Sequence, residues 1–438
     1  MFLFGSSGIR GLVNTEVTPE LALNVGKALG TLHPGDIVIG SDPRTSGQML
    51  KSALVSGILS AGAGAFDVGM VSTPTLAYAA RRRRCGAMLT ASHNPPEYNG
   101  IKLWNPDGSG FGVRQSDEVE KLMNSGKFKA ADWKEIGALE FDNNAIEEHK
   151  SAILSAVGQA RDVKVVLDCG CGAGSTITPY LLREMGCNVI ALNSQPDGFF
   201  PARLPEPTDA NLSTLKKVVV DSGADIGIAH DGDADRMCAV DRNGKYISND
   251  LLLAFFAKFE KAKRIVVPVD TSMAIEDYTG AKVIRTKVGD VFISETLKEK
   301  EGDFGGEPSG TWIFPKFSYC PDGIYAAARI ARLASEIDIA EELKKIPSYP
   351  MMRGKLECAN NKKKKAMGEI RKALLSMPHK SMNETDGIRI DADDGWVMVR
   401  QSGTEPILRI SAEARTEPAV RKIYDSALAT VNGVLKGV

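Results

Sequence analysis

Short apolar runs recur three times in the same order along this chain of 438 residues, and this repeat constrains the fold more than any other feature. The runs of the three units lie at residues 36–40, 65–69 and 86–90, then 163–167, 187–191 and 224–229, then 264–268, 281–285 and 302–305. Stretches with a helical pattern, such as residues 50–61 and 249–259, separate them. This alternation is typical of parallel strands that helices cover on both faces. The sequence therefore predicts three related α/β units.

The chain beyond residue 346 departs from this repeat. Strand-like runs at residues 396–399 and 407–411 enclose a polar loop, and a helical pattern follows over residues 419–435. This order predicts a smaller α+β domain, and the length of the chain is well above that of one typical core. We therefore expect four domains. Their expected limits are residues 1–142, 143–240, 241–346 and 347–438.

Charge and cysteine spacing argue against several classes of protein. A formal net charge of −1 gives no global attraction to nucleic acid or membrane, and the basic runs 81–84 and 362–365 are best interpreted as solvated helix faces. The seven cysteines form no C-x-x-C pair, which argues against a disulfide framework or a zinc site. No run approaches the ~18 apolar residues of a membrane helix, and the first residues lack a signal-peptide pattern. We expect a cytoplasmic protein without nucleic-acid or membrane partners.

A polar loop with a serine follows the third run of the first unit. Ser92 lies beside His93 in a stretch rich in Asn, Pro and Gly, and Lys102 comes ten residues later. These residue types hold a turn that continues neither a strand nor a helix. We expect the Ser92 hydroxyl to be exposed to a ligand and able to carry a covalent intermediate. The alternative is an ordinary turn in which Ser92 bonds only its own backbone.

A loop with three carboxylates takes the same place in the second unit. Asp231, Asp233 and Asp235 alternate directly after an apolar run, and such crowding is unfavourable at neutral pH unless a cation neutralises it. Hard oxygen ligands of this kind suit Mg²⁺, which often shares its coordination with a phosphate. A calcium loop of the EF-hand type would need Gly and Glu where this chain has Arg236 and Arg242. A purely structural turn remains the other alternative.

Loops in the third unit and the C-terminal domain offer groups for a phosphorylated sugar. Glu307 and Ser309 could bond neighbouring sugar hydroxyls, although a Gly-Pro-Ser turn is common. The loop over residues 400–409 combines two arginines with hydroxyl groups and a glycine, a set that suits a phosphate monoester, although a hairpin with an exposed Arg–Glu pair would look similar. Because ligands bind beyond the carboxyl ends of parallel strands, the loops of the three units could face one cleft.

Together these loops resemble the α-D-phosphohexomutase family, which includes phosphoglucosamine mutases, phosphomannomutases and phosphoglucomutases. The loop at residues 306–310, here called the sugar loop, and the first residues are most similar to those of archaeal phosphoglucosamine mutases. The resemblance covers nearly the whole chain, at residues 4–11, 90–102, 196–201, 205–207, 231–236, 306–310 and 400–409.

The resemblance implies a fold and an activity. The fold would be three related α/β/α domains, with mixed and mostly parallel sheets, and a C-terminal α+β domain around a central cleft. The enzyme would interconvert glucosamine 6-phosphate and glucosamine 1-phosphate through a phosphoserine and a hexose 1,6-bisphosphate. A phosphomannomutase or phosphoglucomutase with the same mechanism is the alternative, and a phosphatase or a non-catalytic sensor is a more distant one. The partners would be small sugar phosphates, and the chain a monomer or homodimer.

The resemblance also implies residue roles. Ser92 would carry the phosphoryl group, and Asp231, Asp233, Asp235 and a phosphoserine oxygen would hold Mg²⁺. Lys102, a candidate general base, and Arg10 would lie near the phosphoserine. The substrate-binding residues would be Arg236, Lys287, Glu307, Ser309, Arg400, Ser402, Gly403, Thr404 and Arg409. Many bacterial members have a histidine where this chain has Thr311, which leaves the identity of the general acid or base open.

Overall fold

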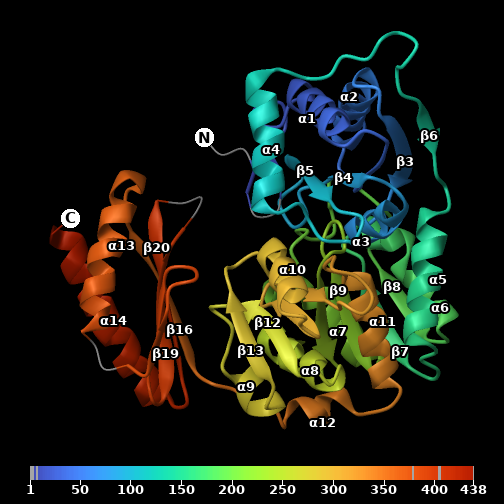
Figure 1. Cartoon of the computed structure of the whole chain (residues 1–438). Helices are drawn as coiled ribbons and strands as arrows, with labels where there is room; N and C mark the ends of the chain where they lie inside the picture. Colours follow the sequence, from blue (N-terminus) through green and yellow to red (C-terminus); the bar gives the residue numbers. More distant parts are fainter. Residues whose placement is uncertain (1–3, 6–7, 377–378, 403–405, 438) are drawn as a thin grey trace.

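The computed structural model describes residues 4–5, 8–376, 379–402 and 406–437. Figure 1 shows three α/β/α units in contact with one another, and a fourth, C-terminal unit beside the third. The fold therefore has the predicted class, three α/β/α domains with mixed sheets and a C-terminal domain built on an antiparallel sheet. Among the helices of the described residues, none is long and apolar enough to cross a membrane.

The first unit is a six-stranded sheet in the order β1-β5-β4-β2-β3-β6. Its strands are β1 (Ile9–Leu12), β2 (Asp36–Ser41), β3 (Gly64–Met70), β4 (Cys85–Leu89), β5 (Tyr98–Trp104) and β6 (Leu139–Phe141). Helices α1 (Pro19–Leu32), α2 (Gly47–Ser60) and α4 (Val113–Ser125) cover one face, and α3 (Thr73–Ala79) lies on the other. Side chains alternate along a strand, so Ile37 and Ile39 pack with α1 and α2, whereas Val38 packs with α3.

The second and third units repeat this plan with sheet orders β11-β10-β9-β7-β8 and β13-β12-β14-β15. The second contains α5 (Ala145–Val157), β7 (Lys164–Asp168), α6 (Thr178–Glu184), β8 (Asn188–Leu192), α7 (Ser213–Ser222), β9 (Ile226–His230), β10 (Met237–Asp241) and β11 (Tyr246–Ile247). The third contains α8 (Asn249–Phe259), β12 (Arg264–Pro268), α9 (Ala274–Thr279), β13 (Lys282–Thr286), α10 (Asp290–Glu299), β14 (Phe304–Glu307), β15 (Thr311–Ile313), α11 (Gly323–Ala334) and α12 (Ile339–Leu343).

The three sheets share one arrangement of strands. Each contains a set of three parallel strands, to which the first sheet adds β6, and the third strand of the set turns into an antiparallel neighbour, giving the pairs β4–β5, β9–β10 and β14–β15. In every unit the order is return strand, third strand, first strand, second strand. The three loops singled out from the sequence are therefore the hairpins of these pairs, at residues 90–97, 231–236 and 308–310. The predicted threefold repeat is confirmed in both order and direction.

The C-terminal unit is a five-stranded antiparallel sheet in the order β16-β20-β19-β18-β17. Its elements are β16 (Met351–Glu357), α13 (Asn360–Leu375), β17 (Ser381–Asn383), β18 (Ile388–Asp391), β19 (Gly395–Gln401), β20 (Ile407–Ala414) and α14 (Glu417–Gly437). Val397, Val399 and Leu408 pack under the two helices. Trp396 and Met398, on the opposite face of β19, pack against Val269 of the third unit. This contact fixes the unit to the rest of the molecule.

Candidate active site

The serine loop begins where β4 ends, and its geometry brings it against the second unit. Ser92 has a φ of 51°, in the left-handed region, and its Oγ donates to Asp231 Oδ2 at 2.6 Å. The residue is only 1% exposed, so the expectation of an exposed hydroxyl is wrong for this conformation. The aspartate loop, residues 231–236, covers Ser92. Its Gly232 packs so closely that an added Cβ there would lie only 2.5 Å from the Ser92 carbonyl oxygen.

Two buried residues that the sequence analysis missed hold the serine loop in place. Arg44 Nη2 donates to the carbonyl oxygens of Ser92 (2.9 Å) and Asn94 (2.6 Å). Its Nε donates to Asp42 at 3.0 Å. Asp42 also accepts from Thr90 Oγ1, which in turn accepts from the Ser92 backbone N–H. Both charged residues follow β2 at its carboxyl end, which is the signal that could have revealed them.

The three aspartates form a cluster with the character of a cation site. One carboxylate oxygen from each of Asp231, Asp233 and Asp235 lies within 4.8 Å of the other two, and all three residues are buried. Asp233 Oδ1 and Asp235 Oδ1 have no hydrogen-bond partner within the described part of the chain. A buried carboxylate oxygen without a partner is costly. The cluster therefore fits a hard divalent cation such as Mg²⁺.

Lys102 on β5 shares this cluster. Its Nζ donates to Asp233 Oδ2 at 3.0 Å and to Asp235 Oδ2 at 2.6 Å. Burial alone would lower the pKa of Lys102, but the two carboxylates raise it above its ordinary value. Burial alone would raise the pKa of Asp233, but Lys102 and a hydrogen bond from Thr73 lower it. Burial and then the two other aspartates raise the pKa of Asp231. The geometry makes Lys102 an ammonium.

Arg10 and His93 lie on the first-unit side of the cluster. Arg10 Nη1 donates to Asn94 Oδ1 at 2.8 Å, and burial followed by Arg236 lowers the pKa of Arg10. The Nδ1 of His93 is 3.4 Å from Ser92 Oγ. Burial and then the nearby cations lower the pKa of His93 to about 2. His93 is therefore neutral at physiological pH.

The sugar loop ties the third unit to the second. Glu307 Oε1 accepts from the Gly289 N–H at 2.6 Å, and its Oε2 accepts from Ser309 Oγ at 3.0 Å. The Thr311 hydroxyl lies 2.6 Å from Ser309 Oγ, and the backbone of Thr311 forms a bridge with Arg236. Burial, and then Asp290, raise the pKa of Glu307 to about 7. Thr311 therefore orients the sugar loop through hydrogen bonds.

Lys287 lies just before α10, close to the loop that Glu307 holds. Its Nζ is 5.6 Å from the ring centre of Phe292. The next residue, Val288, donates its N–H to Asp386 Oδ2 of the C-terminal unit at 3.2 Å. This segment therefore connects the sugar loop with the C-terminal unit.

The phosphate loop, residues 400–409, includes the end of β19 and the start of β20. Arg400 and Arg409 are direct partners across these strands, and Ser402 is buried. Gly403 and Thr404 lie outside the described residues. Lys363 is buried and donates from Nζ to the Ser402 carbonyl oxygen at 2.7 Å. The expectation of a fully solvated run at residues 362–365 is therefore wrong at this lysine, although its three neighbours are exposed.

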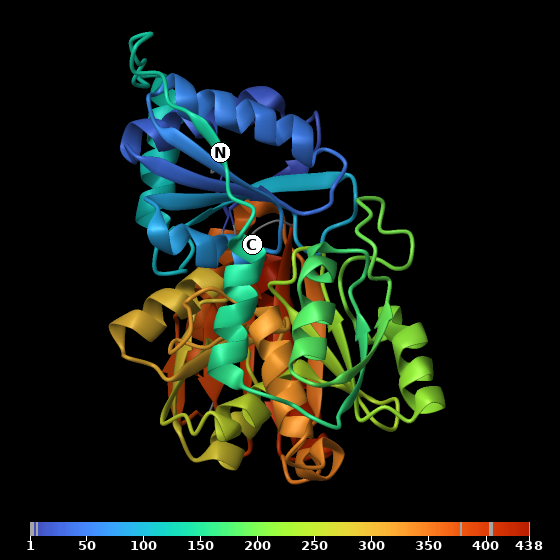
Figure 2. The same cartoon turned by 90° about the vertical axis from the view of Figure 1, so that its right-hand side faces the viewer.

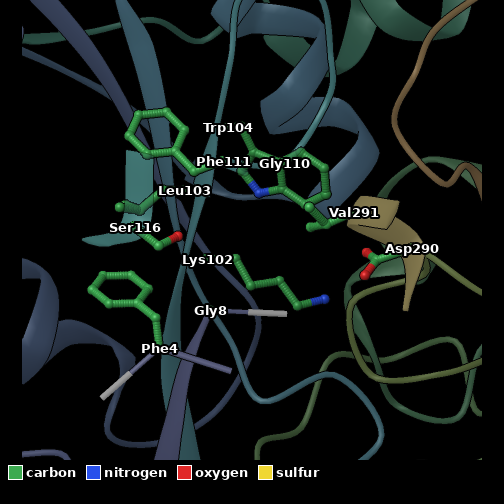
Figure 3. A pocket seen from close by; sticks show the side chains of 10 residues that line it. All are labelled: Phe4, Gly8, Lys102, Leu103, Trp104, Gly110, Phe111, Ser116, Asp290 and Val291. Carbon is green, nitrogen blue, oxygen red and sulfur yellow. The ribbon is translucent and has the colours of Figure 1, made fainter. Parts of the chain in front are cut away.

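A narrow cavity lies beside the site, between the first and third units (Figure 3). In Figure 3 the side chains of Lys102 and Asp290 point toward each other across it, with Phe4 and Phe111 on the first-unit side. The cavity volume is about 20 Å³, enough for about one water molecule. It can therefore hold water near Lys102 but not a hexose phosphate.

Comparison with known proteins gives one consistent family. Models of phosphoglucomutase/phosphomannomutase match the chain in order. The α/β/α domains I, II and III match residues 1–130, 144–244 and 248–349, and the C-terminal domain matches residues 355–429. A probable phosphoglucosamine mutase of Methanosarcina barkeri is 54% identical over 440 residues, covering 100% of both chains. One of Methanothermobacter thermautotrophicus is 46% identical, covering 99% of this chain and 98% of that one.

A solved structure agrees with these sequence matches. A phosphoglucomutase/phosphomannomutase family protein from Burkholderia thailandensis superposes with a TM-score of 0.90 at 26% identity, covering 99% of this chain and 97% of that one. An N-acetylphosphoglucosamine mutase of Aspergillus fumigatus, solved with GlcNAc-6P and magnesium, shares the fold at a TM-score of 0.60 and 15% identity, covering 99% and 96%. With four consecutive domain matches and relatives alike over their full length, the chain belongs to the phosphoglucomutase/phosphomannomutase family.

Proposed function

We propose that this enzyme interconverts glucosamine 6-phosphate and glucosamine 1-phosphate through phosphorylated Ser92 and a hexose 1,6-bisphosphate. The observation that carries the proposal is the 2.6 Å hydrogen bond from Ser92 Oγ to Asp231 Oδ2. The Ser92 hydroxyl thus lies at the edge of a buried carboxylate cluster, an arrangement that supports phosphoryl transfer to and from a serine. The choice of sugar rests on the relatives, several of which are probable phosphoglucosamine mutases with 54% identity.

Asp231, Asp233 and Asp235 would hold Mg²⁺, together with an oxygen of phosphorylated Ser92. The partnerless Oδ1 atoms of Asp233 and Asp235 support this assignment, as does the preference of Mg²⁺ for carboxylate oxygens. When bound, the ion would offset charge on the phosphoryl oxygens during transfer. The Aspergillus relative, which shares only the fold, was solved with magnesium.

The chain's own residues account for the transfer. The P–O bond to Ser92 Oγ breaks as a P–O bond to the free sugar hydroxyl forms, and the hydroxyl proton ends on Ser92 Oγ. The serine then donates to Asp231, as it does in this structure. The bisphosphate turns over in the cleft and returns its other phosphoryl group to Ser92. The ammonium of Lys102 offsets negative charge, and a role as general base would require it first to leave Asp233 and Asp235.

The remaining residues would bind the substrate. Glu307 and Ser309 would select the sugar, because they form a linked acceptor and donor pair. Arg10 would add positive charge near the reacting phosphate, and Arg236 and Lys287 would bind the substrate. Arg400, Ser402, Gly403, Thr404 and Arg409 would hold the phosphate that does not react. Such a cradle of several donors can accept the phosphate of either substrate orientation.

Intact-mass measurement combined with coupled assays tests the proposal. Incubation with hexose 1,6-bisphosphate should add one phosphate to the wild type and to Ser294→Ala, a control at another buried serine, but not to Ser92→Ala. Turnover of glucosamine 6-phosphate should fall by about 10³-fold or more in Ser92→Ala, because a covalent nucleophile is lost. Faster turnover of mannose 1-phosphate or glucose 1-phosphate would favour the alternative substrates. Net release of inorganic phosphate would indicate a phosphatase.

A further inference from the structure

A buried histidine outside the predicted site joins two helices that flank the aspartate loop. His149 lies on α5 and is 0% exposed. Its Nδ1 is 3.0 Å from Thr75 Oγ1, which belongs to α3 of the first unit. Its Nε2 is 3.1 Å from Oδ2 of Asp322, the residue that caps α11. His149 therefore connects three parts of the chain that are far apart in sequence.

The first connection leads to Asp233. Thr73, at the start of α3, donates its N–H to the Asp233 carbonyl oxygen at 2.9 Å and its hydroxyl to Asp233 Oδ2 at 2.5 Å. The same turn is fixed by Ser72, whose Oγ lies 2.7 Å from Thr75 Oγ1 and accepts from the Thr75 N–H. The bond to His149 thus anchors the turn that orients the Asp233 carboxylate.

The second connection reaches the other side of the same loop. Asp322 Oδ1 accepts from two N–H groups in the first turn of α11. At Gly323, the next residue, a Cβ would lie 2.3 Å from the Arg236 carbonyl oxygen and 2.8 Å from that of Ala234. The start of α11 therefore lies directly against the aspartate loop. Figure 2 shows α5 and α11 side by side below the first unit.

These contacts form a closed ring around the aspartate loop, through Thr73, Thr75, His149 and Asp322. The order of hydroxyl, imidazole and carboxylate is that of a hydrolytic triad. However, Thr75, His149 and Asp322 are at most 2% exposed. The imidazole also stacks on Tyr78, with ring centres 5.2 Å apart. No substrate can reach this ring, so its role is to position the loop.

We propose that His149 is a positioning residue that closes this ring and so sets the affinity of the aspartate loop for Mg²⁺. The inference rests on the proposed magnesium site. Thr73 and Lys102 both bond Oδ2 of Asp233, while its Oδ1 has no hydrogen-bond partner among the described residues. Loss of the bond between His149 and Thr75 would release the turn of α3 and let the carboxylate rotate. Mutation of residues that orient metal ligands through hydrogen bonds lowers metal affinity or activity.

The test uses His149→Phe, which keeps the stacked ring and removes both hydrogen bonds. Free Mn²⁺, followed by electron paramagnetic resonance during titration of the full-length protein with MnCl₂, reports the affinity of the site. We expect binding about 10-fold weaker than in the wild type, the lower end for loss of an outer hydrogen-bond partner. We also expect high Mg²⁺ to restore most of the turnover, which a general folding defect would not allow.

Two further variants keep the outcome decisive. Thr75→Val removes the bond to His149 from the other side, together with the bond of Thr75 Oγ1 to Ser72 Oγ, and should weaken Mn²⁺ binding at least as much, even if His149→Phe folds poorly. Phe317→Leu alters the neighbouring ring stack without touching the hydrogen bonds and should bind Mn²⁺ like the wild type. Wild-type affinity in both ring variants would overturn the inference and leave the magnesium site standing. No Mn²⁺ binding by the wild type would overturn both.

Discussion

The two loops that meet at Ser92 each contain a non-glycine residue in the left-handed region. Ser92 has a φ of 51° and Ala234 a φ of 56°. Such residues cost on the order of 1–3 kcal/mol and persist only where their surroundings fix them. At Ser92 the fixing groups are Arg44 and the hydroxyl of Thr90. These buried hydrogen bonds thus hold the strained backbone that directs the Ser92 hydroxyl toward the aspartate cluster.

Glu307 gives a prediction on pH at the scale of a single residue. Its pKa is raised to about 7, so protonation removes its charge as the pH falls through neutrality. If the carboxylate binds the protonated 2-amino group of the sugar, KM for glucosamine 6-phosphate, corrected for titration of the substrate amine, should rise roughly tenfold from pH 8 to pH 6. Steady-state kinetics over this range measure the effect.

The matched control for this prediction is Glu307→Gln. It keeps the size of the side chain and an acceptor for the Gly289 N–H, but it has no proton to gain. Its KM should be higher at pH 8 and should change little toward pH 6 beyond what titration of the substrate itself causes. An equally steep rise in this variant would show that Glu307 is not the titrating group.

At the scale of elements, the contact between the serine and aspartate loops is tight enough to test with one methyl group. In Gly232→Ala the new Cβ would meet the Ser92 carbonyl oxygen at 2.5 Å, which forces the two hairpins apart. A displacement of about 1 Å between reacting groups can cost about 10²-fold in rate, and we expect a loss of that order in kcat. Stopped assays with purified protein would measure it.

Gly368→Ala on α13 is the companion variant. No atom lies within 4 Å of its added Cβ, and the residue is helical. It should leave kcat unchanged and stabilise the protein by roughly 0.5–1 kcal/mol, the usual gain of Ala over Gly in a helix. Wild-type kcat in Gly232→Ala would mean that the loops can separate without cost to catalysis.

Elements with a strong local pattern could be predicted from the sequence, and others could not. The central strands β4, β7, β9 and β12 were predicted as apolar runs because they are buried on both faces, and a loop with chemistry follows β4 and β9 within a few residues. By contrast, β17 and β18 are short strands with few apolar residues, and neither was predicted. Within the run of four lysines, the sequence did not reveal which one faces the core. Lys363 does, because it lies on the same buried face of α13 as Ala366 and Ile370.

The same distinction holds within the candidate site. Ser92 and the three aspartates could be found because each motif is continuous in sequence. Arg44 was missed although its place after β2 was a signal, because its partner at Ser92 lies 48 positions away, and His149 had no such signal, because Asp322 lies 173 positions away. Periodicity does not encode which distant group a buried polar side chain meets. The roles of the substrate-binding residues and the limits of the four domains stay predictions.

At the scale of the molecule, a buried carboxylate adds to the apolar contact that seats the C-terminal unit on the third unit. Glu413 accepts from Ser272 Oγ (2.5 Å), the Met273 N–H (2.8 Å) and Trp396 Nε1 (2.8 Å). In Glu413→Gln an amide NH₂ would replace an acceptor facing these donors. We expect a loss of about 1–3 kcal/mol in stability and a higher KM, because the phosphate loop lies on this unit.

Calorimetry and small-angle scattering, together with kinetics, would check this prediction. Glu417→Gln, at an exposed position on α14, is the control; it loses only an exposed ion pair with Arg421, so its stability should fall by no more than about 0.5 kcal/mol and its KM should match the wild type. If Glu413→Gln keeps the melting temperature and KM of the wild type, the unit is held by its apolar contacts alone.

The antiparallel return strand in each of the three sheets has an evolutionary consequence. Because both ends of every hairpin are hydrogen-bonded to neighbouring strands, the few residues between them can be exchanged without shifting the register of the core. The proposed nucleophile, metal ligands and sugar contact thus lie in three separate hairpins. Substitutions can therefore accumulate in the hairpin proposed to bind the sugar while the two hairpins proposed for phosphoryl transfer stay unchanged.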